Sequence, residues 1–272
     1  MADEQSMITL RRVEDMPGLE LISARNITHA LPRHMHGALC LVIVDHGARE
    51  CRYKGSRYVV TPGQVQVVRP GDVHTCSSAG GRYSYRAICL TMGAVAACAA
   101  AAFPKLTAEV PCCSPVVDDG ELYRLLAAAH EALAGAGGTM ARETALHKVF
   151  LRLAGYADPS AASLRSGGEN QAVKLIQQYL AEHYADDVSI SDLALVTGFS
   201  PYHLIHVFTA ALGLSPHAYL NQVRISRAKQ LLAAGGGLAE AALAVGFADQ
   251  SHFQRWFKKI VGVTPGQYAA ML

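Results

Sequence analysis

An internal repeat in the C-terminal part of the chain restricts its fold more than any other feature of the sequence. Gly198-Phe199-Ser200 recurs 48 positions later, from 198 to 246, as Gly246-Phe247-Ala248. Five further pairs share an offset of 49, from 203 to 252 onward: His203/His252, Phe208/Phe257, Gly213/Gly262, Pro216/Pro265 and Tyr219/Tyr268. A single inserted residue near Asp249 accounts for the change of offset. A unit present twice predicts two similar helical subdomains in tandem.

The first copy carries the signals of two short helices joined by a tight turn. Ser191 is expected to cap a helix that ends at Gly198, because glycine adopts a left-handed conformation at little cost. Ser200 then caps a second helix with Pro201 at its first position, where no N–H is needed. The periodicity directs Leu204, Val207 and Phe208 to the core and leaves outward Tyr202, His203, Ile205, His206 and Thr209.

The second copy repeats this arrangement with Gly246 at the turn and Asp249 as the cap. Phe253 and Phe257 face inward, and the outward side chains are Gln250, Ser251, Gln254 and Arg255. Amides and guanidinium groups pair with base edges in the major groove, while Lys258 on the next turn suits a phosphate. If the connecting helix over Pro216–Leu232 is rigid, the two reading helices lie about 34 Å apart, one turn of DNA. We therefore predict that both helices bind DNA.

The overall charge of this region gives no support to DNA binding. From Ser166 to the C-terminus, seven Lys and Arg residues are balanced by seven Asp and Glu residues. The charge that binds phosphate must therefore come from local clusters.

From Asn170 to the end the sequence resembles the AraC/XylS family of transcription regulators. The resemblance is carried by Leu193-Ala194, Gly198-Phe199-Ser200, Phe208, Gly213, Pro216, Tyr219, Arg224, Ala228, Leu231-Leu232, Gly246-Phe247, Phe253, Arg255, Phe257-Lys258-Lys259, Gly262, Thr264-Pro265 and Tyr268. It implies an all-α tandem helix-turn-helix domain over 170–272 that binds promoter or operator DNA. It also implies control by a small-molecule effector, a homodimer and, for an activator, contact with RNA polymerase. One departure is Gly235-Gly236-Gly237, which is expected to loosen the joint between the two units.

The first hundred residues contain many short segments of strand character separated by turns. The expected strands are Leu39–Val44, Tyr58–Val60, Val65–Val68 and Tyr83–Leu90. This part resembles the double-stranded β-helix, or cupin-like barrel, that serves AraC-type regulators as an effector-binding domain. The sequence therefore predicts a two-domain α+β fold with a sensor domain over 1–105.

Two amphipathic helices are expected between the barrel and the DNA-binding domain. Glu121–Leu133 and Arg142–Leu153 both carry apolar residues at helical spacing. We assign 106–160 to a helical dimerisation or interdomain segment and 161–169, rich in Ser and Gly, to a linker.

Histidines near the expected strands are candidates for the effector site. His34, His36 and Cys40 would share one face of an unbroken strand, and His74 could complete a set of four ligands suited to zinc or another divalent metal. The alternatives are that these side chains bind an organic effector, or that they and Cys76 form a metal or redox sensor. A metal-dependent cupin enzyme is a further rival, but Cys40 replaces the acidic ligand of metal-bearing cupins, so we expect no enzyme activity. Further polar candidates for the pocket are Arg33, Gln66, Tyr85 and Arg86.

The address expected from the sequence is the cytoplasm. No basic start followed by an apolar run is found in Met1–Leu10, and the longest apolar stretch, Gly93–Phe103, is about half the length that crosses a bilayer. An odd number of cysteines, seven, argues against a disulfide framework.

Overall fold

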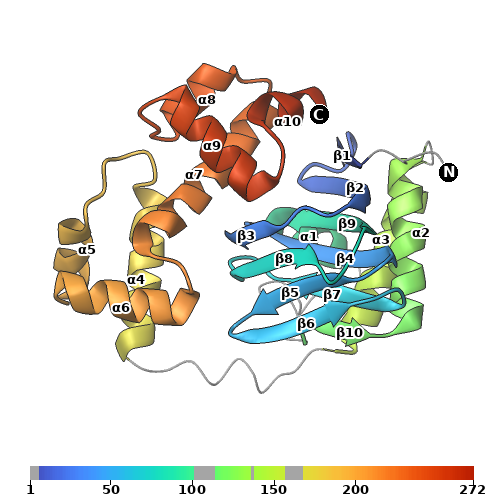
Figure 1. The fold of residues 1–272 in the computed structure, drawn as a ribbon. Helices are drawn as coiled ribbons and strands as arrows, with labels where there is room; N and C mark the ends of the chain where they lie inside the picture. The colour runs from blue at the N-terminus through green and yellow to red at the C-terminus, as the bar shows by residue number, and fades with distance from the viewer. Residues whose placement is uncertain (1–5, 101–113, 136–137, 157–167) are drawn as a thin grey trace. The chain divides into compact units, whose positions relative to one another are not determined.

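The structure is a computed structural model that describes residues 6–100, 114–135, 138–156 and 168–272. The chain divides into two compact units, one formed mainly by residues before position 163 and the other mainly by residues after it. Most of the predicted linker over 161–169 lies outside the described residues. Figure 1 shows a β-rich unit, drawn in blue to green, and a helical unit, drawn in yellow to red.

Two β-sheets form the framework of the first unit. A six-stranded sheet has the order β1-β2-β9-β4-β7-β10, and a four-stranded sheet has the order β3-β8-β5-β6. The strands are β1 (Met7–Arg12), β2 (Leu19–Ile27), β3 (Leu31–His34), β4 (Ala38–His46), β5 (Arg49–Tyr53), β6 (Ser56–Val60), β7 (Gln64–Val68), β8 (His74–Ser78), β9 (Tyr83–Thr91) and β10 (Val116–Asp118). Pairing is antiparallel throughout the larger sheet, and β5 is antiparallel to both β6 and β8. The predicted β-rich first domain is confirmed.

The six-stranded sheet has one face toward helices and one toward the second sheet. Side chains alternate along β4, so Leu41 and Ile43 join a buried cluster with helices α2 (Gly120–Ala134) and α3 (Thr139–Ala154). Val42 and Val44 point the other way, into a second buried cluster that includes Val60 of β6. A shorter helix, α1 (Met92–Ala100), follows β9. The space between the two sheets is therefore separate from the core under the helices.

Asp119 fixes the start of α2 and ties it to the end of α3. Its Oδ1 atom accepts hydrogen bonds from the backbone N–H groups of Glu121 (2.9 Å) and Leu122 (3.1 Å). Its Oδ2 atom accepts from Arg152 Nε and Tyr156 Oη, both at 2.6 Å. The Arg152 hydrogen bond, more than that of Tyr156, holds the pKa of the Asp119 carboxyl well below its usual range. An ionised carboxylate therefore joins the two helices at neutral pH.

The second unit contains the predicted repeat. Its helices are α4 (Gly168–Glu182), α5 (Ile190–Thr197), α6 (Pro201–Leu212), α7 (Pro216–Ala233), α8 (Leu238–Ala244), α9 (Gln250–Val261) and α10 (Pro265–Ala270). Helix α7 connects the subdomain of α4, α5 and α6 to that of α8, α9 and α10 (Figure 1). The pairs α5–α6 and α8–α9 are the two helix-turn-helix units, as the sequence predicts.

The turns and caps of both units follow local chemistry. Gly198 and Gly246 have φ values of 72° and 85°, in the region that favours glycine. Ser200 accepts a hydrogen bond from the backbone N–H of His203, and Asp249 caps α9 in the same way. The predicted cap at Ser191 is wrong, because α5 begins one residue earlier than that cap requires. Ser189 is the cap, in a reciprocal pair of hydrogen bonds with Asp192.

A joint between the two subdomains is formed by the segment Tyr184–Asp186, which follows α4. Arg224 of α7 donates hydrogen bonds to the carbonyl oxygens of Tyr184 (2.7 Å) and Asp186 (2.9 Å). A Cβ atom placed on Gly246 would lie only 2.5 Å from the Ala185 carbonyl oxygen. The loop of the second unit thus packs directly on the backbone of the first.

No single helix among the described residues is both long and apolar enough to cross a bilayer. Helices α5 and α6 reach that length and hydropathy only together, and they are bent by 86° at the turn of the first helix-turn-helix unit.

Candidate nucleic-acid interface and effector site

The outward face of α6 carries the side chains expected from the sequence. Tyr202 is 84% exposed and Ile205 is 39% exposed. His203 and His206 are also exposed, and Thr209 is partly exposed. Leu204 and Phe208, on the opposite side of the helix, are fully buried with Leu193 of α5. The core residues therefore fix which side of α6 is available to a ligand.

Helix α9 has the same division into a buried and an open side. Phe253 and Phe257 are fully buried, whereas the exposed set is Gln250, Ser251, Gln254, Arg255 and Lys258. Trp256, which the sequence interpretation passed over, donates a hydrogen bond from Nε1 to His252 Nε2 at 2.8 Å. Its ring also lies 4.6 Å from the Lys259 ammonium group. These contacts hold the second basic residue of the last turn beside the indole ring.

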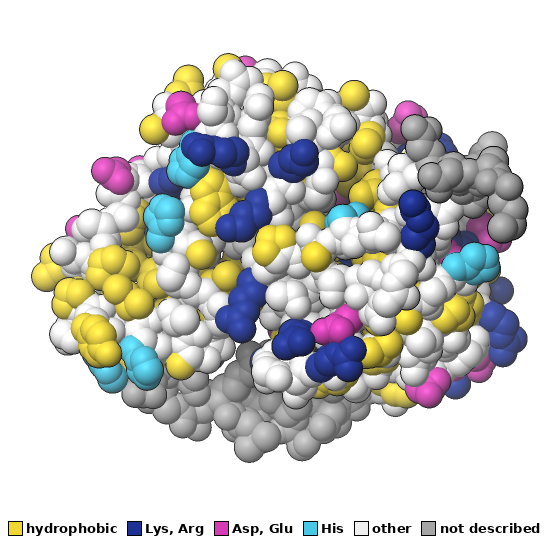
Figure 2. All heavy atoms as spheres, in the orientation of Figure 1, with side chains coloured by type: hydrophobic (Ala, Val, Ile, Leu, Met, Phe, Trp, Pro, Cys, Tyr) yellow, Lys and Arg dark blue, Asp and Glu magenta, His cyan; other side chains and the backbone are white. Residues whose placement is uncertain are grey.

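Basic side chains are dispersed rather than concentrated on the surface seen in Figure 2. Lys and Arg side chains stand among apolar and polar ones on that face. This agrees with the balanced charge of the region after Ser166 and makes local contacts the source of phosphate binding.

The predicted metal ligands do not lie on one unbroken strand. Strand β3 ends at His34 in the four-stranded sheet, and β4 begins at Ala38 in the six-stranded sheet. The parity expected for His34, His36 and Cys40 is therefore lost. Possible ligand atoms of His34, His74 and Cys76, on the neighbouring strands β3 and β8, lie within 4.8 Å of one another. The ring of His36 lies 5.2 Å from that of His74, and Cys40 is buried on β4.

A buried arginine lies beside this group. Arg49 of β5 is 4% exposed, and its Nη2 atom donates a hydrogen bond to Cys76 Sγ at 2.9 Å. Cys51 lies opposite Cys76 in the pairing of β5 with β8. A hydrogen bond from Cys51, followed by the charge of Arg49, holds the pKa of the Cys76 thiol well below its usual value. The same thiol–thiol hydrogen bond raises the pKa of Cys51.

The sequence interpretation missed Arg49, although a signal was present. Arg49, Cys51 and Tyr53 alternate along β5, and all three are buried. Of the polar candidates that were named, Gln66 and Tyr85 are buried and accompany Arg49. Arg86 instead pairs with Asp45 and Glu131 beside α2, and Arg33 is exposed on β3.

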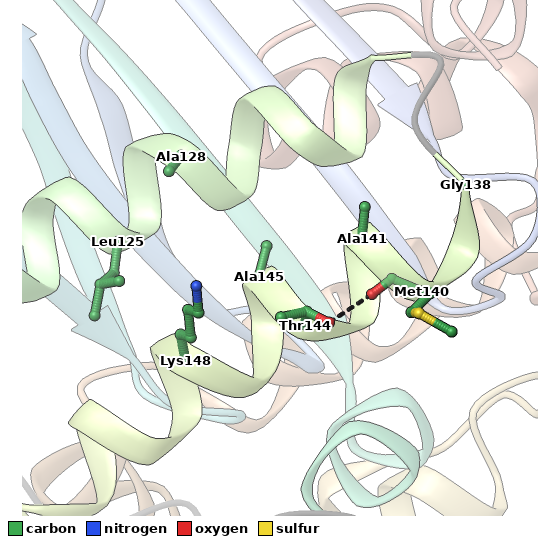
Figure 3. A pocket seen from close by; sticks show the side chains of 8 residues that line it. All are labelled: Leu125, Ala128, Gly138, Met140, Ala141, Thr144, Ala145 and Lys148. Carbon is green, nitrogen blue, oxygen red and sulfur yellow. Dashed lines mark hydrogen bonds between the residues drawn. The ribbon is translucent and has the colours of Figure 1, made fainter.

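A shallow pocket of about 650 Å³ lies on the outer side of α2 and α3. Figure 3 shows Leu125 and Ala128 of α2 opposite Ala141, Ala145 and Lys148 of α3. The Thr144 hydroxyl is turned back to the Met140 carbonyl oxygen, to which it donates a hydrogen bond of 2.7 Å. The lining is therefore largely apolar and formed by helices that the sequence assigned to dimerisation.

Comparison with known proteins matches both units to protein families. Residues 16–150 match the family described as AraC-like ligand binding domain, and residues 178–271 match a helix-turn-helix domain family. A Bacillus subtilis protein named uncharacterized HTH-type transcriptional regulator YbfI is 31% identical over 239 residues, which are 86% of this chain and 85% of the relative. The arabinose operon regulatory protein of Escherichia coli is 38% identical over 95 residues, 34% of this chain and 32% of that protein.

Solved structures of ToxT from Vibrio cholerae have a similar fold. The apo form superimposes with a TM-score of 0.63 and 15% identity, covering 94% of this chain and 98% of ToxT. Wild-type ToxT bound to an unsaturated fatty acid has a TM-score of 0.63 at 14% identity, covering 99% and 96%. Identities this low show a common fold.

Proposed function

Because the chain belongs to the AraC-type helix-turn-helix transcriptional regulators, we propose that α6 and α9 read base edges of one DNA site and that a small molecule bound between the sheets of the first unit controls that binding. The observation that carries the proposal is the duplicated helix-turn-helix. Both copies have the same left-handed glycine, the same type of cap and an exposed polar face. Transcription then changes without any chemical reaction, and the protein acts in the cytoplasm, where its DNA is found.

The DNA contacts divide into two classes. We assign base reading to Tyr202, His203, Ile205, His206 and Thr209 of α6 and to Gln250, Ser251, Gln254 and Arg255 of α9. Gln pairs with adenine and Arg with guanine through two hydrogen bonds, which gives α9 the greater discrimination. Lys258 holds phosphate and fixes the register of the helix.

Selection of binding sites from a pool of random DNA duplexes tests this function. We expect the full-length protein to enrich a sequence with two short conserved blocks, because each helix reads a few successive bases. Binding to the enriched site should be at least about a thousandfold tighter than to unrelated DNA at physiological salt. A pool without enrichment after repeated rounds, from protein with a cooperative thermal transition, would contradict the proposal.

The effector site has two candidate chemistries. An organic effector is favoured by the buried polar groups between the sheets and by the fatty acid bound to ToxT. A metal or redox sensor is the second candidate, supported by the grouping of His34, His74 and Cys76 and by the opposed Cys51 and Cys76. The guanidinium of Arg49, 2.9 Å from Cys76 Sγ, opposes a metal cation there by like charge.

We place a homodimer contact on the outer side of α2 and α3. Met140 is 80% exposed and Leu151 is 55% exposed on α3, next to the apolar pocket. Two chains on one DNA double the base and phosphate contacts, so affinity multiplies. For an activator, the remaining surface would contact RNA polymerase.

Met140→Glu is expected to shift the protein from dimer to monomer in sedimentation velocity, because a charge placed in an apolar contact loses its hydration. The change should weaken self-association at least about tenfold. Leu243→Glu is the matched control, since Leu243 of α8 is 68% exposed and lies outside this pocket. An unchanged sedimentation coefficient for Met140→Glu would remove the dimer contact from this face.

A further inference from the structure

Arg49 places a positive charge in the space between the two sheets of the first unit. It is 4% exposed, and its guanidinium carbon lies 4.6 Å from the ring centre of Tyr85, on β9 of the opposite sheet. A guanidinium group stays protonated in proteins. Removing it from water is unfavourable unless hydrogen bonds and an opposite charge compensate.

Compensation from the described chain is incomplete. Nη2 donates to Cys76, but Nε and Nη1 are buried and have no hydrogen-bond partner among the described residues. The side-chain oxygen of Gln66, which lies against Cys51 in the same interior, is also buried and unpaired there. Buried polar groups are nearly always hydrogen-bonded, so three unpaired atoms in one place need an explanation.

Titratable groups around Arg49 include no carboxylate among the described residues. The groups whose charges act on it are the Cys76 thiol and the phenols of Tyr85 and Tyr83, and the half-buried His29 is close enough to be affected by it. A Cys76 thiolate could balance the charge through Nη2. It would still leave the donors at Nε and Nη1 without an acceptor, so the thiol does not account for the geometry.

The rest of the interior is apolar. Val42 and Val44 of β4, Val60 of β6 and Ala87 of β9 are all buried in one cluster with Tyr85. A molecule between the sheets would therefore contact apolar side chains except at the Arg49 end. One guanidinium group matches one carboxylate in charge and in hydrogen-bond geometry, whereas a dianion would bury a net negative charge.

We propose that the effector is a monocarboxylate with an apolar body and that its carboxylate accepts hydrogen bonds from Nε and Nη1 of Arg49. This inference rests on the proposed effector-binding role of the first unit and names the chemical class that the site takes. The apolar body lies against Val42, Val44, Val60 and Ala87, and the Cys76 thiol remains on Nη2.

Thermal unfolding of the full-length protein with matched pairs of compounds tests the proposal. The panel contains straight-chain acids from acetate to dodecanoate, together with benzoate and phenylacetate, each beside its primary amide at the same concentration. We expect at least one acid to raise Tm in a saturable manner and its amide to have no effect. The amide keeps the apolar body but lacks the charge that Arg49 binds.

Variants of Arg49 then locate the contact by calorimetric titration with the stabilising acid. Arg49→Met should weaken binding at least about tenfold, and Arg49→Lys should fall between it and the natural protein. Arg52→Met is the matched control, because Arg52 lies on the same strand with its side chain 67% exposed. Its dissociation constant should be unchanged.

Three results would overturn the proposal: no acid raises Tm, amides bind as tightly as acids, or Arg49→Met binds as the natural protein does. If Arg49→Met does not fold, the comparison of acid with amide decides alone. Stabilisation by zinc without any response to acids would overturn it in favour of the metal sensor. Stabilisation by neutral sugars or amides would reject the carboxylate and keep the effector-binding function, which the DNA selection tests separately.

Discussion

The double substitution Gln254→Ala and Arg255→Ala is expected to lower affinity for the selected DNA site by at least about 30-fold. Each two-bond contact with a base is worth about 1–3 kcal/mol of discrimination. Both side chains are exposed on α9, so their removal leaves the buried Phe253 and Phe257 in place and the fold intact. Fluorescence anisotropy with labelled DNA, at fixed salt, measures the change.

Lys258→Ala is the comparison that separates reading from phosphate binding. It should weaken binding to selected and unrelated DNA alike and reduce the slope of log affinity against log salt by about 1. A double variant that keeps its affinity within about threefold would show that α9 does not read the site.

The second large effect is expected from Gly246→Ala, which should destabilise the helical unit by about 2–5 kcal/mol. Alanine at φ 85° costs about 1–2 kcal/mol. The new Cβ atom would also meet the Ala185 carbonyl oxygen at 2.5 Å, and relieving that overlap must move backbone. Urea unfolding followed by Trp256 fluorescence measures the loss, because the single tryptophan of the chain lies in this unit.

Gly198→Ala is the control provided by the repeat itself. Gly198 also has a positive φ, 72°, but its Cβ position has no atom within 4 Å. This variant should lose only the conformational cost, about 1–2 kcal/mol. Equal losses for the two alanine variants would show that the contact with Ala185 is not part of the folded state in solution.

The helical unit could be predicted in detail because its determinants are local. The offset repeat gave the two units, and Gly198, Ser200 and Asp249 gave the turns and caps. The cap of α5 was misplaced from Ser189 to Ser191 because both are good caps. Only the reciprocal bond with Asp192 selects between them.

The effector site could be predicted only in part because its residues come together through sheet pairing. Parity placed His36 and Cys40 with His34, but the break between β3 and β4 separates the strands into different sheets. Arg49 was missed because an arginine in sequence indicates solvent, and its burial depends on partners about 25 to 40 residues away. Arg224 was taken for part of a basic helix, yet it holds backbone carbonyls instead.

The joint at Tyr184–Asp186 has a consequence for the kind of DNA that this protein can accept. Arg224 on one side and Gly246 on the other leave the segment little freedom to change the relative orientation of the two subdomains. Any mismatch in phase between the two recognition blocks must then be absorbed by bending or twisting the duplex. Flexible pyrimidine–purine steps between the blocks will therefore be favoured, at base pairs that no side chain touches.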